Sequence, residues 1–148
     1  MKIYVINGPN LNMLGIREPE TYGRESYATL LEMLLMHAKK RGIEIVPYQS
    51  NHEGDLVDKI QEAYFEGADG IVINPGAYTH TSIALLDAVK ATKLRCVEVH
   101  ISDLSVREDF RQISYIRLAS EKTITGKGLN GYIEAIDYLI DNKCKDAR

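Results

Sequence analysis

The chain has 148 residues and a mass of 16.7 kDa, and because this is typical of one domain we expect residues 1–148 to form a single domain. Hydrophobic residues make up 45% and charged residues 26% of the sequence, an ordinary globular composition that excludes disorder as the main state. The net charge of −3 offers no basic surface for nucleic acid, and no apolar run is long enough for a membrane helix. The first residues read as a strand rather than a signal peptide, so we expect a cytoplasmic protein without nucleic-acid or membrane partners.

Apolar runs typical of strands alternate with amphipathic helical patterns along the chain. The predicted strands lie at 2–7, 43–50, 70–74, 95–100 and 122–125. The predicted helices lie at 26–41, at 56–64 with Gly67 as the end, after a cap at Thr79 or Thr81, near 107–111, and at 132–142. Long connections without periodicity span 8–24 and 101–120, and connections of this length usually carry function.

This order predicts an α/β fold with a doubly wound parallel sheet and helices on both faces. Pro47 cannot donate a backbone hydrogen bond, which places the second strand at an edge. A five-stranded sheet with that edge suits the flavodoxin-like order 2-1-3-4-5, in which ligands bind beyond the carboxyl ends of the strands. Cys96 falls in a predicted buried strand, so a free core thiol is favoured over a disulfide with Cys144.

Polar residues collect where three of the predicted strands end. These segments are Asn7–Asn12, Asn74–Ser82 and Glu98–Asp103. The preference of turns for glycine and proline explains those residues, but it does not explain why His80 and His100 both lie where a predicted strand ends. Glu98 shares one face of its strand with His100, so general acid–base work and substrate hydrogen bonding are the favoured interpretation.

Two other interpretations of these residues are weaker. The strand-end histidines could hold a metal with Glu98 or Asp103 as a third ligand, but no H-x-H or H-x-x-x-H spacing supports it. Segment 126–131 matches G-x-G-x-x-G, but the chain after it lacks room for the further strand and acidic residue of a dinucleotide site.

The other two histidines are expected to have no chemical role: His37 lies on a solvated helix face and His52 in a turn.

Five ordered motifs, covering essentially the whole chain, closely resemble the type II dehydroquinase (3-dehydroquinate dehydratase) family. They are Gly8–Asn12 followed by Arg17–Gly23, Asn74–Ser82, Glu98–Ser102, Arg107–Arg111, and Gly126-x-Gly128-x-x-Gly131-Tyr132. The resemblance implies a flavodoxin-like lyase that converts 3-dehydroquinate to 3-dehydroshikimate by trans-elimination of water, in the shikimate pathway to chorismate and the aromatic amino acids. It also implies a homododecamer, a tetramer of trimers, without cofactor, metal or lysine Schiff base.

The resemblance assigns roles to individual residues. Tyr22 corresponds to the base, and because a free tyrosine has a pKa of ~10, Arg17 is the cation expected to favour its phenolate. Asn10 corresponds to the enolate partner, His100 to the general acid, and Glu98 to the group that holds the His100 tautomer. The implied substrate-binding residues are Asn74, His80, Asp87 (toward a neighbouring subunit), Ile101, Ser102 and Arg111. We further expect segment 8–24 to act as a lid hinged at Gly15 and Gly23, with Arg107 associated with it.

Departures from the family pattern are local: Leu86 replaces an arginine, Asp103 an asparagine, and Gln112-Ile113 a more basic pair. The alternative from another class is a non-enzymatic flavodoxin-like binding domain. Such a domain would not need the Arg17–Tyr22 pair together with Asn10 and His100, so the enzymatic interpretation is favoured.

Overall fold

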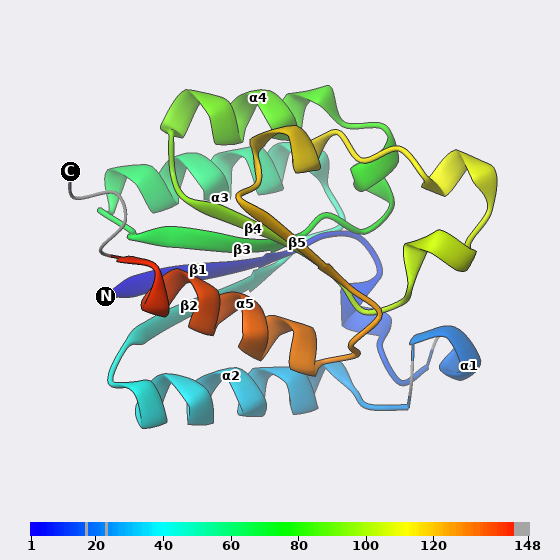
Figure 1. Cartoon of the computed structure of the whole chain (residues 1–148), viewed down its shortest axis with the longest axis horizontal. Coiled ribbons are helices and arrows are strands. Elements are labelled where there is room, and N and C mark those ends of the chain that lie inside the picture. Colours follow the sequence, from blue (N-terminus) through cyan, green and yellow to red (C-terminus); the bar gives the residue numbers. More distant parts are fainter. Residues whose placement is uncertain (17, 23, 144–148) are drawn as a thin grey trace.

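A computed structural model of the chain describes residues 1–16, 18–22 and 24–143 (Figure 1). It confirms the predicted sheet: five strands, all parallel, in the order β2-β1-β3-β4-β5. The strands are β1 (Lys2–Asn7), β2 (Glu44–Gln49), β3 (Gly70–Asn74), β4 (Cys96–His100) and β5 (Lys122–Thr125). Pro47 lies in the edge strand β2, where a missing N–H donor costs least.

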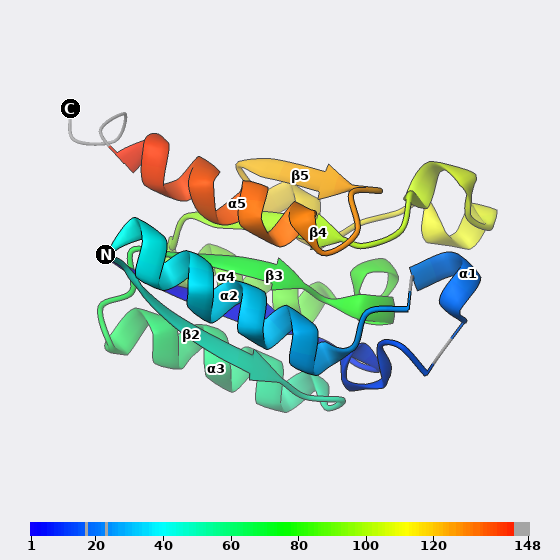
Figure 2. The ribbon, with the colours of Figure 1, turned by 90° about the horizontal axis from the view of Figure 1, so that it is seen from below.

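Helices cover both faces of the sheet. These helices are α2 (Tyr27–Arg41), α3 (Glu53–Phe65), α4 (Ile83–Thr92) and α5 (Asn130–Asp141), whereas the short helix α1 (Pro19–Tyr22) lies beyond the carboxyl ends of the strands (Figure 1). Helices α2 and α5 lie against one face and α3 and α4 against the other, as Figures 1 and 2 show. Each face buries its own hydrophobic cluster, because the fully covered strands are apolar on both sides.

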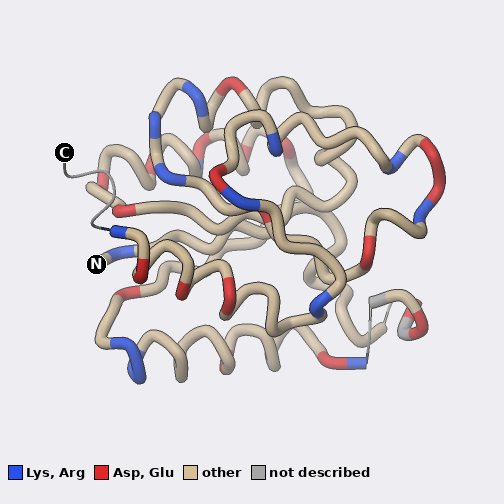
Figure 3. The backbone as a smooth tube through the Cα atoms, in the orientation of Figure 1, with Lys and Arg blue, Asp and Glu red and all other residues tan. Residues whose placement is uncertain are grey.

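The carboxyl ends of the strands all point to one edge of the sheet, and irregular structure gathers there (Figure 1). Short 3-10 helices follow β1, β3 and β4 at this edge. They are η1 (Leu11–Met13), η2 (Gly76–His80), η3 (Leu104–Val106) and η4 (Asp109–Arg111), and η5 (Ile116–Ala119) leads into β5. Basic and acidic residues are interspersed along the chain (Figure 3), and no helix in its described part is long and apolar enough to cross a membrane.

Two local predictions at this edge need correction. Helix α4 is capped by Ser82, whose Oγ accepts from the Leu85 N–H at 3.0 Å, because residues 76–80 already form η2. His80 therefore ends η2 instead of opening α4. The short helix predicted near 107–111 is present as the 3-10 turn η4, but Arg107 lies outside it at the end of η3, so Arg107 and Arg111 do not share one helical face.

Two predictions concern residues packed between elements. Cys96 is a free, buried thiol in β4, with its Sγ 3.6 Å from Ser120 Oγ, while Cys144 lies outside the described residues. The solvated face predicted for His37 was wrong: its side chain is only 11% exposed, and Nε2 lies 2.7 Å from Asp137 Oδ1. Helix α5, which carries Asp137, packs beside α2 (Figure 2). The apolar pattern of α2 alone could not reveal that this neighbour partly buries His37.

Candidate active site

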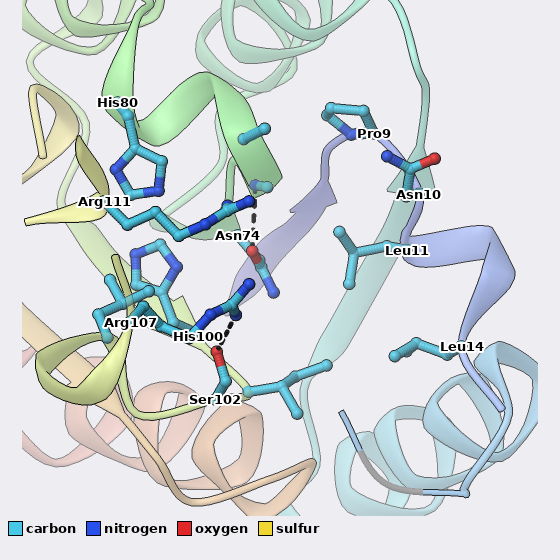
Figure 4. Close-up of a pocket in the computed structure, with 14 residues that line it drawn as sticks. Pro9, Asn10, Leu11, Leu14, Asn74, His80, His100, Ser102, Arg107 and Arg111 are labelled. Carbon is cyan, nitrogen blue, oxygen red and sulfur yellow. Dashed lines mark hydrogen bonds between the residues drawn. The ribbon is translucent and has the colours of Figure 1, made fainter. Parts of the chain in front are cut away.

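The carboxyl ends of β1, β3 and β4 border one pocket (Figure 4). Polar and apolar side chains line it together, as is usual for small-molecule sites. The lining residues are Pro9, Asn10, Leu11, Leu14, Asn74, Gly76, Ala77, His80, His100, Ile101, Ser102, Leu104, Arg107 and Arg111. The structure thus brings together all the predicted substrate-binding residues except Asp87, together with Asn10 and His100.

Two glycines let the loops after β1 and β3 interlock beneath the pocket. A Cβ at Gly8 would stand 2.3 Å from the Pro75 carbonyl oxygen, and one at Gly76 would stand 2.9 Å from the Pro9 carbonyl oxygen. Gly76 also has φ +59°, a conformation that residues with a side chain rarely adopt. The Gly8 N–H donates to the Asn74 carbonyl at 2.8 Å. The backbones therefore touch directly and fix the two pocket walls relative to each other.

His100 ends β4 and pairs with Glu98 inside the sheet. Its Nε2 lies 2.6 Å from Glu98 Oε1, and the Glu98 carboxylate has no exposed surface. The carboxylate also accepts hydrogen bonds from Ser114 Oγ at 2.6 Å and from Thr123 Oγ1 at 2.9 Å. Thr123 is the direct β5 neighbour of Glu98 in the sheet register, so β5 supplies part of the carboxylate's support.

The environment of Glu98 favours its ionised form. Burial alone would raise the pKa of this carboxyl, but the hydrogen bonds and charge of His100, with those from the Ser114 and Thr123 hydroxyls, hold the pKa below its ordinary value. Arg117 adds a cation 3.5 Å from Oε2. An ionised acceptor fixes which ring nitrogen of His100 it bonds, and it leaves the other nitrogen for the pocket.

His80 faces the same pocket in a defined hydrogen-bonding state. Its Nδ1 donates to the Ile113 carbonyl at 2.7 Å. Burial is the main cause that lowers the pKa of His80 below its ordinary value, and the nearby Arg111 adds to the effect. A neutral imidazole that donates through Nδ1 keeps Nε2 as an acceptor, which suits a ligand hydroxyl.

Two guanidinium groups lie on the His80 and His100 side of the pocket (Figure 4). Arg107 donates to Ser102 Oγ at 3.1 Å, and Arg111 is held by Glu108 at 2.8 Å. Ser102 and Ile101 directly follow β4 and line the pocket between His100 and Arg107. Planar guanidinium donors beside a hydroxyl suit a carboxylate ligand.

A buried polar chain supports Asn74 from below. Its Nδ2 donates to the Tyr132 hydroxyl at 2.9 Å, and that hydroxyl donates to Asn7 Oδ1 at 2.6 Å. Asn74 Oδ1 accepts from the Gly76 N–H at 3.2 Å, which fixes both ends of the amide. Burial raises the pKa of Tyr132 well above its ordinary value, so the phenol stays neutral and keeps the proton that it donates.

The remaining predicted residues belong to α1, α4 and the start of η3, or fall outside the described residues. Tyr22 is the last residue of α1, whereas Arg17 and the proposed hinge Gly23 lie outside the described residues. Asp87 is exposed on α4 and does not line the pocket of its own chain. Asp103 caps η3 by accepting from the Ser105 N–H at 2.9 Å. Among the described residues, no group of three or more His, Cys, Asp or Glu is arranged to hold a metal ion.

Sequence reasoning missed several supporting residues. Asn51 and Gln49, at the carboxyl end of β2, bond to the loop that carries Asn10, and Ser114 and Thr123 bond Glu98. The position of Gln49 and Asn51 after a predicted strand was a usable signal, because all parallel strands end at the same edge. The contacts of Ser114 and Thr123 depend on chain-distant packing, which no local pattern reports.

Comparison with known proteins identifies the family. A model of the class II dehydroquinase family matches residues 1–140. The chain belongs to this family. It is 54% identical to a 3-dehydroquinate dehydratase of Lachnoclostridium phytofermentans, over 95% of this chain and 97% of that protein. A relative of the same name from Corynebacterium glutamicum is 51% identical, over 96% of this chain and 97% of its own length.

Solved structures of class II dehydroquinases share the fold. The type II dehydroquinase of Butyrivibrio crossotus superposes with a TM-score of 0.94 at 56% identity, covering 95% of this chain and 97% of that one. The enzyme from Propionibacterium acnes gives a TM-score of 0.90 at 36% identity, covering 95% and 96%. The flavodoxin-like α/β architecture predicted from the sequence is confirmed.

Proposed function

We propose that this chain is a type II 3-dehydroquinate dehydratase, a hydro-lyase that converts 3-dehydroquinate to 3-dehydroshikimate in the shikimate pathway. Membership in the class II dehydroquinase family supports the reaction. One observation carries the proposal in the structure: the Glu98-bonded His100 and the polar Asn10 line the same pocket as two arginines. That pocket offers an acid, an enolate dipole and a site for the substrate carboxylate.

The reaction removes a proton from the carbon beside the ketone and then expels the hydroxyl on the next carbon. In our proposal, Tyr22, activated by Arg17, takes the proton, and the electron pair left behind forms an enolate. The Asn10 amide offers a fixed dipole to that developing charge. As the enolate collapses to the conjugated enone, the carbon–oxygen bond breaks, and His100 donates a proton so that water leaves instead of hydroxide.

The remaining pocket residues hold the substrate. Asn74, His80 and Arg111 are assigned to the ring hydroxyls, and their amide, acceptor nitrogen and guanidinium provide both donors and acceptors. Ile101 and Ser102 are assigned to the carboxylate. Arg107, 3.1 Å from Ser102 Oγ, is placed to support that end of the substrate. No step of this mechanism calls for a cofactor, metal or lysine imine.

The decisive experiment measures the ultraviolet absorbance of the conjugated product when purified protein meets 3-dehydroquinate. We expect turnover in wild type, its near loss in Tyr22→Phe, and retained binding of a substrate analogue by that variant, because general base catalysis is typically worth ~10²–10⁴-fold. Tyr64→Phe is the matched control, since Tyr64 is 52% exposed on α3, away from the pocket. Wild-type protein that leaves the substrate unchanged would favour the non-enzymatic binding domain instead.

The assembly and location belong to the same proposal. Asp87 is exposed on α4, where it is free to reach a neighbouring subunit's pocket, and this supports a homododecamer built from trimers. Light scattering should therefore give a species much larger than 16.7 kDa, and a fully active monomer would contradict it. We further propose that residues 1–148 act as one catalytic domain in the cytoplasm, which cell fractionation would test.

A further inference from the structure

The loop that carries Asn10 is anchored to the edge strand β2 by side chains that do not line the pocket. The Asn10 N–H donates to Asn51 Oδ1 at 3.0 Å. Gln49 Nε2 donates to the same Asn51 oxygen at 3.0 Å and to the Gly8 carbonyl at 3.2 Å. Asn51 is itself held by the Tyr78 hydroxyl, which donates to its backbone carbonyl at 3.0 Å. The anchor thus joins β2, the β1 loop and η2.

Asn10 needs such an anchor because its backbone is left-handed. Its φ is +70° and its ψ is 0°, a conformation that asparagine tolerates but that costs free energy relative to the right-handed regions. These two angles set the direction in which the Asn10 amide leaves the chain. The hydrogen bond from its own N–H to Asn51 is therefore placed to decide whether the amide reaches the pocket.

We propose that Asn51, assisted by Gln49, is a positioning residue for catalysis: it holds Asn10 in the left-handed conformation that presents its amide to the enolate. This inference rests on the role of Asn10 in the proposed function. Figure 4 shows Asn10 on the side of the pocket opposite His80 and Arg111. Asn51 contacts η2 through its backbone carbonyl, so a change of its side chain acts on the Asn10 side of the pocket. Asn51 would then influence proton removal and leave substrate binding nearly unchanged.

The chemistry of the anchor defines the test variants. Asn51 uses Oδ1 as an acceptor in both side-chain bonds, so Asn51→Asp keeps the acceptor whereas Asn51→Ala removes it. His52→Ala is the matched control, because the neighbouring His52 has no side-chain cap bond and no assigned role. Asn10→Gly deletes the Asn10 amide yet leaves a residue that adopts positive φ without cost.

We expect Asn51→Ala to lower kcat about tenfold, the equivalent of one lost hydrogen bond, with KM within about twofold. The deuterium isotope effect at carbon 2 of the substrate should rise, because proton removal becomes slower relative to the later steps. Asn51→Asp should stay within about threefold of wild type and His52→Ala should match it. A purely structural role would lower the melting temperature without changing the isotope effect, and that result would overturn the inference.

A double-mutant comparison separates this inference from the proposed function. In the Asn10→Gly background, adding Asn51→Ala should change kcat by less than about twofold, because neighbours that act through one group are not additive. If Asn51→Ala lowers kcat tenfold in both backgrounds, Asn51 acts on a group other than Asn10. If Asn51→Ala has wild-type kcat whereas Asn10→Gly has a lowered kcat, the positioning role of Asn51 is refuted and the role of Asn10 stands. Wild-type kcat in Asn10→Gly would instead refute the role of Asn10, and the anchor's role with it.

Discussion

Replacing Tyr132 by phenylalanine should lower both the stability of the protein and its affinity for substrate. Tyr132 lies on α5 with no exposed surface, and its hydroxyl joins Asn7 at the end of β1 to Asn74 at the end of β3. The substitution keeps the ring but removes the one group that both asparagines share. Asn7 is poorly placed to compensate, because its Nδ2 already lacks a hydrogen-bond partner among the described residues.

The size of the effect follows from what is left unpaired. Asn7 Oδ1 loses its donor and Asn74 Nδ2 loses its acceptor, and each buried unsatisfied group costs ~1–3 kcal/mol. We expect the free energy of unfolding to fall by about 2–4 kcal/mol, a large share of the ~5–15 kcal/mol that typical proteins have. Because the Asn74 amide then keeps only its bond from the Gly76 N–H, it is held less firmly, and KM for 3-dehydroquinate should rise several-fold.

Urea unfolding at one fixed protein concentration measures the stability change. With a slope of about 2 kcal/mol per molar urea, the middle of the usual ~1–3, the midpoint should drop by about 1–2 M. Tyr138→Phe is the control, since Tyr138 lies on the same helix and its hydroxyl has no hydrogen bond to any described residue. If Tyr132→Phe lowers the unfolding free energy by no more than Tyr138→Phe does, the buried chain does not hold the strand ends together.

Three further substitutions test the pocket. Gly8→Ala should lower kcat/KM more than tenfold, because the new methyl would stand 2.3 Å from the Pro75 carbonyl oxygen, whereas Gly54→Ala on α3 meets nothing within 4 Å and should leave kinetics unchanged. The pKa of Glu98 in the folded protein lies below its ordinary value, so ionisation of Glu98 stabilises the fold. This contribution is fully present above the pKa of the unfolded chain, ~4.3, and is lost as the pH falls through the pKa of the folded protein. The difference in urea stability between wild type and Glu98→Gln should therefore shrink in acid. His100→Ala should lose ~10²–10⁴-fold in product formation, while in heavy water the recovered substrate gains deuterium at carbon 2 faster than product appears.

For each of these three substitutions, one result would contradict the expectation. Normal kinetics in Gly8→Ala would mean that the β1 and β3 loops can separate without harm. A stability difference that stays constant with pH would mean that Glu98 titrates alike in the folded and unfolded chains. Near-wild-type dehydration by His100→Ala would leave that histidine a structural or binding residue, and the acid would have to be sought elsewhere at the strand ends.

The local sequence predicted a structural feature correctly where that feature depends on one element alone. The covered strands β1, β3 and β4 are short apolar runs because helices cover both of their faces, and the run alone reveals them. Pro47 placed β2 at the edge for a reason internal to one residue, its missing N–H. The cap of α4 was misplaced because Thr79, Thr81 and Ser82 are all competent caps, and only the formation of η2 by residues 76–80 selects Ser82.

The sequence by itself determined the parallel sheet, its strand order, the edge at which the site forms and the residue types gathered there, since strand–helix alternation permits few topologies. The pairing of Glu98 with His100 also followed, because side chains two apart share one face of a strand. Only the tertiary structure decided the supports: Tyr132 beneath Asn74, Thr123 beside Glu98, and Asn51 behind Asn10. These contacts join residues 25 to 58 positions apart in the chain, and such partners are chosen by how the helices and strands pack rather than by any local pattern.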